Sequence, residues 1–249
     1  MNMARDIDAY TQQYLKHPFL EENVKYRRRL VLEQMSKYEH NSILEIGCGM
    51  WPIFAYLRES EYEKYTVVEP SETFYNNAKN MAHTEKINVM NGLFEQLSDE
   101  VAKHEYDFII CSSLLHEVDN PKKFLTEVKK CCNSKTIVHI NVPNSNSLHR
   151  LIAYEMGIIR NKESISNSNL KLQQKGPYSM EQLIDEIFDA GFTVDDKGSF
   201  FLKPFSHSQM QMLLDNDIIG ENVIDGLYKV TKYFPEYGSE IYVNAKVLL

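Results

Sequence analysis

The chain has 249 residues, of which 43% are hydrophobic and 25% are charged, a balance typical of a globular protein with a sizeable apolar core. Its 27 Lys and Arg residues against 35 Asp and Glu residues give a formal net charge of −8. This balance argues against a broad basic surface, so we expect no DNA or RNA partner.

The start of the chain has no apolar segment of the kind found in signal peptides, and no uncharged stretch approaches the length of a membrane span. We therefore expect a cytoplasmic protein with no membrane partner. The four cysteines include no C-x-x-C pair, so we expect reduced thiols and no bound metal.

The first elements in chain order are a helical cap and a series of strands. Apolar residues recur at helical spacing over 20–38, which predicts a cap over 1–39. Short apolar runs separated by helical patterns favour parallel strands that helices cover on both faces, in an open, doubly wound α/β sheet. These predicted strands span residues 42–46, 65–68, 87–90, 106–111 and 136–142.

The later part of the chain alternates helices and strands less regularly. Ser179 with Gln182 predicts the capping box of a helix that ends at Gly191. A strand-like stretch around 199–202, two helical patterns over 206–234 and a final strand over 240–248 follow. Because loops tolerate insertion better than core elements do, we assign substrate selection to segments of about 144–178 and 203–238.

The first predicted strand carries an acidic residue and breaks into a glycine turn. Glu45 precedes Gly47 and Gly49, and glycines at such a turn let the backbone approach a ligand closely. Glu69 ends the next strand, near the roughly 20-residue spacing at which an acid reaches ribose hydroxyls. The third glycine of a dinucleotide fingerprint is absent, so we expect a site that does not cradle a pyrophosphate.

This pattern resembles the class I S-adenosylmethionine-dependent methyltransferases, from about residue 40 to the C-terminus. The resemblance implies a Rossmann-like, seven-stranded, mostly parallel sheet with an antiparallel last strand, in a methyltransferase domain over 40–249. It also implies S-adenosyl-L-methionine as cofactor and S-adenosyl-L-homocysteine as product. The cofactor-binding residues that it implies are Glu45, Gly47, Gly49, Glu69, Pro70, Leu93, Phe94 and Ser112.

Two positions depart from the family pattern. Trp51 stands where a third glycine is usual, and we expect it to narrow the methionine end of the cofactor site. Leu93 stands where the family often has an Asp that contacts adenine. Backbone amides and apolar packing near Phe94 are therefore expected to hold the adenine.

The N-terminal cap is expected to contribute to the cofactor site. Tyr10, Tyr14 and His17 belong to a segment that can close over the cofactor, and Tyr14 is our chosen contact. A charge run is usually a solvated helix face, so at most one arginine of 27–29 is expected to be functional. We choose Arg28 as the partner of the methionine carboxylate.

His116 follows the fourth predicted strand, where ligands bind in open α/β folds. Because the ordinary pKa of histidine suits proton removal, His116 is the first candidate for general base and His149 is the second. A structural role for His116, such as capping the following loop, stays open. The candidate acceptor contacts are Asn144, Arg150, Tyr178, Lys203 and His207.

The segments 141–150 and 198–204 resemble a bacterial branch of stand-alone small-molecule methyltransferases, often associated with surface-polysaccharide or antibiotic-sugar pathways. We therefore expect O-methylation of a small polar acceptor, such as a sugar, a sugar nucleotide or a phosphate-type precursor of a cell-surface polysaccharide. N-methylation of an amino sugar and a noncatalytic nucleoside-binding sensor stay open as alternatives. A nicotinamide dehydrogenase is disfavoured because the turn lacks the full dinucleotide pattern. The acceptor and the oligomeric state stay open.

Overall fold

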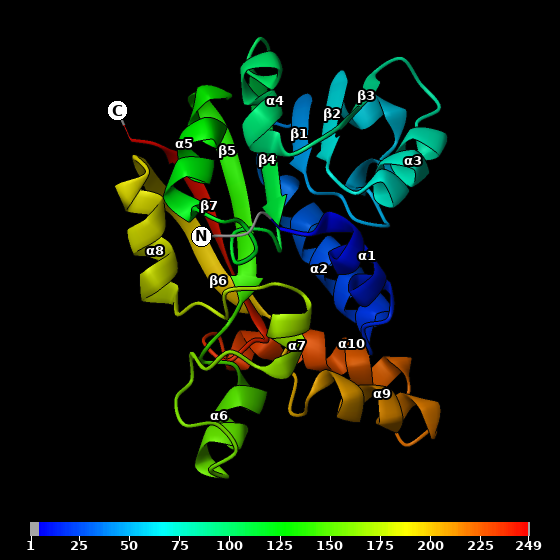
Figure 1. Ribbon diagram of the computed structural model, residues 1–249, viewed down its shortest axis with the longest axis vertical. Coiled ribbons are helices and arrows are strands. Elements are labelled where there is room, and N and C mark those ends of the chain that lie inside the picture. The colour runs from blue at the N-terminus through cyan, green and yellow to red at the C-terminus, as the bar shows by residue number, and fades with distance from the viewer. Residues whose placement is uncertain (1–4, 249) are drawn as a thin grey trace.

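The computed structural model describes residues 5–248. Residues 1–4, which belong to the predicted cap and to the N-terminal segment compared with signal peptides, and residue 249 lie outside the described residues. One sheet has the strand order β3-β2-β1-β4-β5-β7-β6 (Figure 1). β7 pairs antiparallel with both β5 and β6, whereas the remaining pairs are parallel. The predicted Rossmann-like, mostly parallel sheet is confirmed.

The five apolar runs predicted as strands fall within β1 to β5, but β6 differs from the prediction. It begins at Phe192, well before the predicted stretch at 199–202. β6 lies at the edge of the sheet, and between its buried ends exposed residues such as Asp195 alternate with partly buried residues such as Asp196, so it lacks a continuous apolar run. The strands are β1 (Ser42–Ile46), β2 (Lys64–Glu69), β3 (Ile87–Asn91), β4 (Tyr106–Ser112), β5 (Cys132–Pro143), β6 (Phe192–Phe200) and β7 (Glu240–Val247).

Capping side chains begin α5 and α8, and the cap of α8 is the predicted capping box. The Asn120 side chain accepts the Lys123 N–H at the start of α5, and Ser179 with Gln182 forms a capping box at the start of α8. The α-helices are α1 (Ile7–Leu15), α2 (Leu20–Met35), α3 (Glu72–Met81), α4 (Phe94–Val101), α5 (Pro121–Lys130), α6 (Leu148–Glu155), α7 (Asn167–Lys171), α8 (Met180–Asp189), α9 (His207–Asp215) and α10 (Glu221–Lys229). The 3-10 helices are η1 (Ile53–Tyr56), η2 (Glu59–Glu61) and η3 (Val230–Tyr233).

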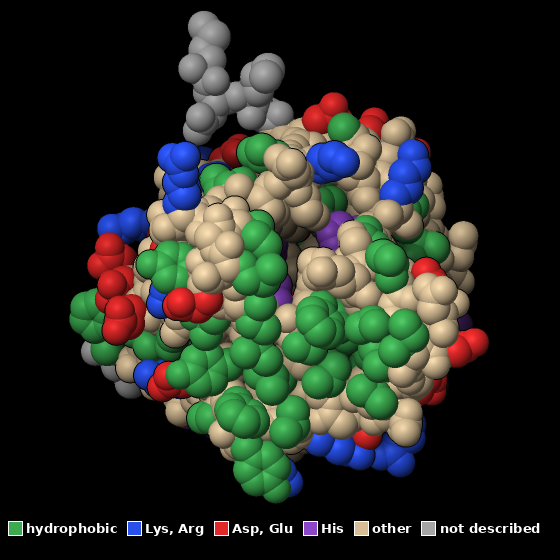
Figure 2. Space-filling view, turned by 90° about the horizontal axis from the view of Figure 1, so that it is seen from below, with side chains coloured by type: hydrophobic (Ala, Val, Ile, Leu, Met, Phe, Trp, Pro, Cys, Tyr) green, Lys and Arg blue, Asp and Glu red, His purple; other side chains and the backbone are tan. Residues whose placement is uncertain are grey.

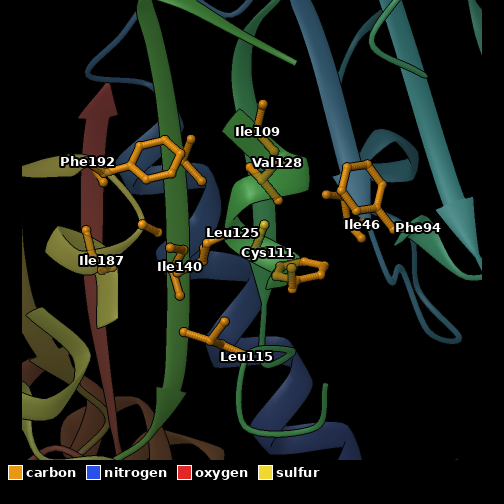
Figure 3. Close-up of a cluster of buried hydrophobic side chains, with 14 of the residues drawn as sticks. Ile46, Phe94, Ile109, Cys111, Leu115, Leu125, Val128, Ile140, Ile187 and Phe192 are labelled. Carbon is orange, nitrogen blue, oxygen red and sulfur yellow. The ribbon is translucent and has the colours of Figure 1, made fainter. Parts of the chain in front are cut away.

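Helices cover both faces of the sheet. On one face, α4, α5 and α8 pack against β1, β4 and β5, and Figure 3 shows this cluster with Leu125 of α5 and Ile187 of α8 turned toward Ile140 of β5. On the other face, Val31 and Met35 of α2 pack with residues of η1 and α3 against β1, β2 and β4. The sheet is therefore a rigid support for the loops at the carboxyl ends of its strands.

A third cluster joins the two ends of the chain. Tyr26 of α2 stacks on Phe201, with ring centroids 5.0 Å apart, and Met210 of α9 and Ile224 of α10 complete the cluster. In Figure 1, α9 and α10 extend below the sheet beside the end of α2. Within residues 5–248, no helix is both long and apolar enough to cross a membrane.

Candidate active site

The turn after β1 brings backbone to the carboxyl edge of the sheet. Gly47 and Gly49 have φ values of +75° and +57°, in the left-handed region that favours glycine. The Glu69 carboxylate at the end of β2 accepts the N–H of Gly49 at 3.0 Å and that of Ser71 at 2.9 Å. The two strand ends are therefore tied together around a backbone surface that a ligand can approach.

Glu45 is engaged by the protein's own groups. Its carboxyl oxygens accept the Ile53 N–H at 3.1 and 3.2 Å and the Tyr65 hydroxyl at 2.8 Å. Burial raises the pKa of Glu45 to about 8, although these hydrogen bonds oppose the shift. Glu45 lines a cavity beside the glycine turn, which we call the cofactor cavity. The hydrogen bonds of Glu45 hold this turn against η1 and β2.

The helix α1 lies across this turn. A Cβ atom added at Gly49 would lie 3.5 Å from the Tyr14 hydroxyl oxygen, and the Thr11 hydroxyl donates to Ser71 Oγ at 2.8 Å. Tyr10 and Tyr14 line the cofactor cavity, which has a volume of about 90 Å³. Pockets for drug-sized ligands have volumes of roughly 300 Å³ or more, so we expect α1 to shift when a nucleoside cofactor binds.

The three arginines of α2 have different partners. Arg27 forms a bidentate pair with Glu240, with nitrogen–oxygen distances of 2.6 and 2.9 Å. Arg29 bonds to acidic side chains of α2 and α10. Arg28 has no acidic partner within residues 5–248, and its guanidinium lies 3.6 Å from the ring centroid of Tyr56. Arg28 lines the cofactor cavity and is therefore the arginine available for a ligand carboxylate.

Most of the predicted cofactor residues border this cavity, together with Trp51. Leu93 and Phe94 are not among its lining residues. Phe94 opens α4 and turns into the core, 5.6 Å from the ring of Phe124, and Figure 3 shows it beside Ile46. The predicted residues that line the cavity are Tyr14, Arg28, Glu45, Gly47, Gly49, Glu69, Pro70 and Ser112.

A second, larger cavity adjoins the first. Its volume is about 330 Å³, and we call it the acceptor cavity. Tyr14, Arg27, Ser113 and Glu117 line both cavities, so they form the wall between them. Tyr178 packs against the hydrophobic core instead. The predicted catalytic and acceptor residues that line this second cavity are His116, His149, Asn144, Arg150, Lys203 and His207.

His116 is fully buried, and neither ring nitrogen has a hydrogen-bond partner in the described part of the chain. Burial lowers its pKa to about 3, and the charges of Arg27 and Arg5 add to this shift. The imidazole is therefore neutral near pH 7 and is a weaker base than an ordinary histidine, but its nitrogens are free beside the acceptor cavity. Its Nε2 atom lies 3.7 Å from the Glu117 carboxylate.

Glu117 joins separate parts of the chain and is absent from the predicted site residues. Its carboxylate accepts hydrogen bonds from Arg5 at 2.5 Å, from Gln174 at 2.8 Å and from the Tyr10 hydroxyl at 3.3 Å. The available sequence signal was its position directly after His116 at a strand end. Its three partners come from distant segments, and sequence spacing does not show this convergence.

The side chains of Asn144 and Arg150 donate hydrogen bonds to backbone carbonyl groups of loops. The Asn144 amide donates to the carbonyls of Glu236 and Gly238, and Arg150 donates to the carbonyls of Lys162 and Ser164. Their hydrogen bonds therefore shape the cavity wall.

Ser113 is another site residue that the sequence did not reveal. Its φ of 54° is unusual for a residue other than glycine. The Asn141 side-chain oxygen accepts the Ser113 N–H at 2.9 Å and holds this conformation in the wall between the cavities.

The sheet order, the glycine turn and the acid at the end of β2 define a class I methyltransferase. A family model described as a methyltransferase domain matches residues 19–196. The chain belongs to this family and is an S-adenosylmethionine-dependent methyltransferase, which confirms the predicted enzyme class and cofactor. No curated protein matches the chain.

Solved structures share the fold at low sequence identity. The plantazolicin methyltransferase BamL, solved with a triazolic desmethylPZN analogue and S-adenosylhomocysteine, is 15% identical, with 97% of this chain and 96% of that chain covered and a TM-score of 0.59. A methyltransferase from Archaeoglobus fulgidus is 19% identical, with coverages of 88% and 94% and a TM-score of 0.55. The N-methyltransferase NodS from Bradyrhizobium japonicum, in complex with S-adenosylhomocysteine, is 11% identical, with coverages of 93% and 88% and a TM-score of 0.55.

Proposed function

We propose that this methyltransferase moves a methyl group to a hydroxyl-type oxygen of a small polar metabolite. The proposed class includes sugars, sugar nucleotides and phosphate-type precursors of a cell-surface polysaccharide. The observation that supports it is the position of the His116 imidazole, which lines the acceptor cavity and whose two nitrogens have no hydrogen-bond partner within residues 5–248. A hydroxyl acceptor must lose a proton during methylation, and a free imidazole nitrogen can take it.

The chain supplies alignment, exclusion of water and proton removal. S-adenosyl-L-methionine, when bound, supplies a methyl group activated by the sulfonium sulfur. The turn at Gly47 and Gly49 with Glu69 would hold its ribose side, and Arg28 would hold its carboxylate. This assignment fits the positive φ values of both glycines and the absence of an acidic partner of Arg28 in the described chain.

In the proton transfer, His116 would take the proton of the acceptor hydroxyl as the oxygen bonds to the methyl carbon. The bond from that carbon to the sulfonium sulfur would break at the same time, which would leave S-adenosyl-L-homocysteine. The imidazolium that results lies 3.7 Å from the Glu117 carboxylate, which stabilises the new positive charge. His149 is the second candidate base, because its Nδ1 atom is also buried without a partner among the described residues.

We assign acceptor selection to the segments 144–178 and 203–238. The first contributes His149 and Arg150 to the acceptor cavity, and the second contributes Lys203 and His207. The cap before residue 40 covers the cofactor through α1, as its contacts with Gly49 and Ser71 indicate.

The test is transfer of a labelled methyl group from S-adenosylmethionine to a panel of sugars, sugar nucleotides and their amino analogues, with His116→Gln beside the wild type. Loss of a general base should lower kcat by about 10²-fold to 10⁴-fold. Binding of S-adenosylhomocysteine, measured by calorimetry, should stay nearly unchanged. The exposed His104 offers the control His104→Gln.

Two results would contradict the proposal. Methyl transfer only to amines would replace it with N-methylation, because an amine with a free lone pair needs less help from a base. Unchanged turnover of a hydroxyl acceptor by His116→Gln would remove His116 as the base and leave His149 to be tested in the same way.

A further inference from the structure

We infer that the methyl acceptor carries an anionic group, a carboxylate or a phosphate, which binds where Lys203, His149 and His207 line the acceptor cavity. The identification of this ligand as the acceptor rests on the proposed function. The anion subsite itself is defined by the charges and hydrogen-bonding groups of the cavity.

The charged side chains of the acceptor cavity favour a bound anion. The two carboxylates of this cavity, Glu117 and Glu240, are already paired with Arg5 and Arg27. Lys203 also lines the cavity, and only 1% of its surface is exposed. Within residues 5–248 it has neither a hydrogen bond nor an ion pair through its ammonium group. A buried ammonium without a partner is costly, so a bound anion would stabilise the charged form of Lys203 in this cavity.

Two helices, α6 and α9, begin at the acceptor cavity. Ser206, His207 and Ser208, at the start of α9, all line the cavity, and the N–H groups of His207 and Ser208 have no acceptor in the described chain. At the start of α6, His149 and Arg150 line the same cavity. Both helix N-termini carry partial positive charge, and α9 adds free N–H donors, whereas the Leu148 and Arg150 N–H groups of α6 donate to carbonyl groups. Partial positive charge and free donors both favour anions.

The histidines add further donors. The Nδ1 atom of His149 is buried without a partner in the described chain, and the His207 ring lies edge-on to His17, with centroids 4.8 Å apart. Burial and the nearby charge of Lys203 lower the pKa of both His149 and His207 well below its ordinary value. Neutral imidazoles can each donate one N–H to an oxyanion. Figure 2 shows histidine side chains inside a hollow on the lower face of the molecule.

The lysine, the helix N-termini and the histidines of this cavity together favour an anion over a metal ion. Within residues 5–248, no group of three or more His, Cys, Asp or Glu side chains is arranged to hold a metal. An ammonium beside helix N-termini would also repel a cation.

The test compares the full-length wild type with Lys203→Met in titrations with inorganic phosphate and, separately, with acetate. Calorimetry and thermal unfolding follow binding, and the ligand with the larger effect distinguishes a phosphate-type from a carboxylate-type subsite. We expect Lys203→Met to weaken binding of that anion at least tenfold. Without ligand, the variant should unfold at the same or a higher temperature, because an apolar side chain replaces a buried charge. The exposed Lys103 offers the control Lys103→Met.

The histidine ring protons give a second readout by NMR, assigned with His149→Gln and His207→Gln. The anion should shift both sets of signals in the wild type and in Lys103→Met. If neither phosphate nor acetate affects the wild type, or if Lys203→Met binds as well as the wild type, the subsite is wrong. If the anion binds as expected but no hydroxyl acceptor is methylated, the proposed function fails and the subsite stands.

Discussion

The two neighbouring cavities of this protein are built in opposite ways. The cofactor cavity lies at strand ends, where Glu45 and Glu69 are bonded to backbone N–H groups of the protein itself. The acceptor cavity is formed largely by late helices and loops, and buried ring nitrogens of His116 and His149 in it have no hydrogen-bond partner within residues 5–248. The sheet therefore preorganises the first cavity, whereas the second has unpartnered polar groups that a ligand could engage.

The largest expected effect on stability comes from the wall that the cavities share. In Arg27→Met, the Glu240 carboxylate loses its bidentate partner while its side chain stays buried, with 9% exposed. Removal of one member of a buried pair costs about 3 kcal/mol or more. Chemical denaturation should show this loss, with Arg29→Met as the control because its ion pairs are more exposed and should cost less than about 1 kcal/mol. Equal losses in the two variants would mean that the shared wall is no more important than a surface pair.

In the cofactor cavity, the titration of Glu45 should make the stability of the protein depend on pH. Burial raises the pKa of Glu45 from an ordinary value of 4.5 to about 8, so the folded protein keeps a proton that the unfolded chain loses between these values. Wild-type stability should therefore fall as pH rises through this window. Glu45→Gln cannot titrate, so its unfolding free energy relative to wild type should increase by about 3 kcal/mol from pH 5 to pH 8. The exposed control Glu100→Gln should show no such trend. If the difference in unfolding free energy between Glu45→Gln and the wild type does not change with pH, the pKa of Glu45 in the folded protein lies near its ordinary value.

In the acceptor cavity, anion binding should depend on pH through Lys203. Burial lowers the pKa of Lys203 to about 7; Glu240 opposes the shift and Arg27 adds to it. The free protein loses the ammonium proton as pH rises through 7, so anion binding must restore it. Affinity for sulfate, whose charge is constant in this range, should fall by up to about tenfold per pH unit above 7. Lys203→Met should bind sulfate weakly at every pH, and a wild-type affinity that rises with pH would contradict the assignment.

The same contrast explains which parts of the site the sequence could predict. Gly47, Gly49 and Glu69 are local signals at strand ends, and the predicted sheet brings such ends together. Phe94 shows the limit of this reasoning, because the orientation of the first turn of α4 decides whether a side chain faces the ligand or the core. The pair of Arg27 with Glu240 spans nearly the whole chain, and this contact depends on tertiary packing that sequence spacing does not show.

The smallest expected effect concerns the helix that covers the cofactor cavity. The Arg5–Glu117 pair and the Thr11–Ser71 hydrogen bond hold α1 over the glycine turn, and we expect the helix to shift before a cofactor enters. Arg5→Met removes one of these contacts and should speed association of S-adenosylhomocysteine by about threefold, because binding limited by a conformational change accelerates when that change is easier. Dissociation should accelerate similarly and leave the Kd nearly constant. Stopped-flow measurements with the exposed control Lys16→Met would check this, and equal association rates for both variants and the wild type would show that α1 does not limit entry.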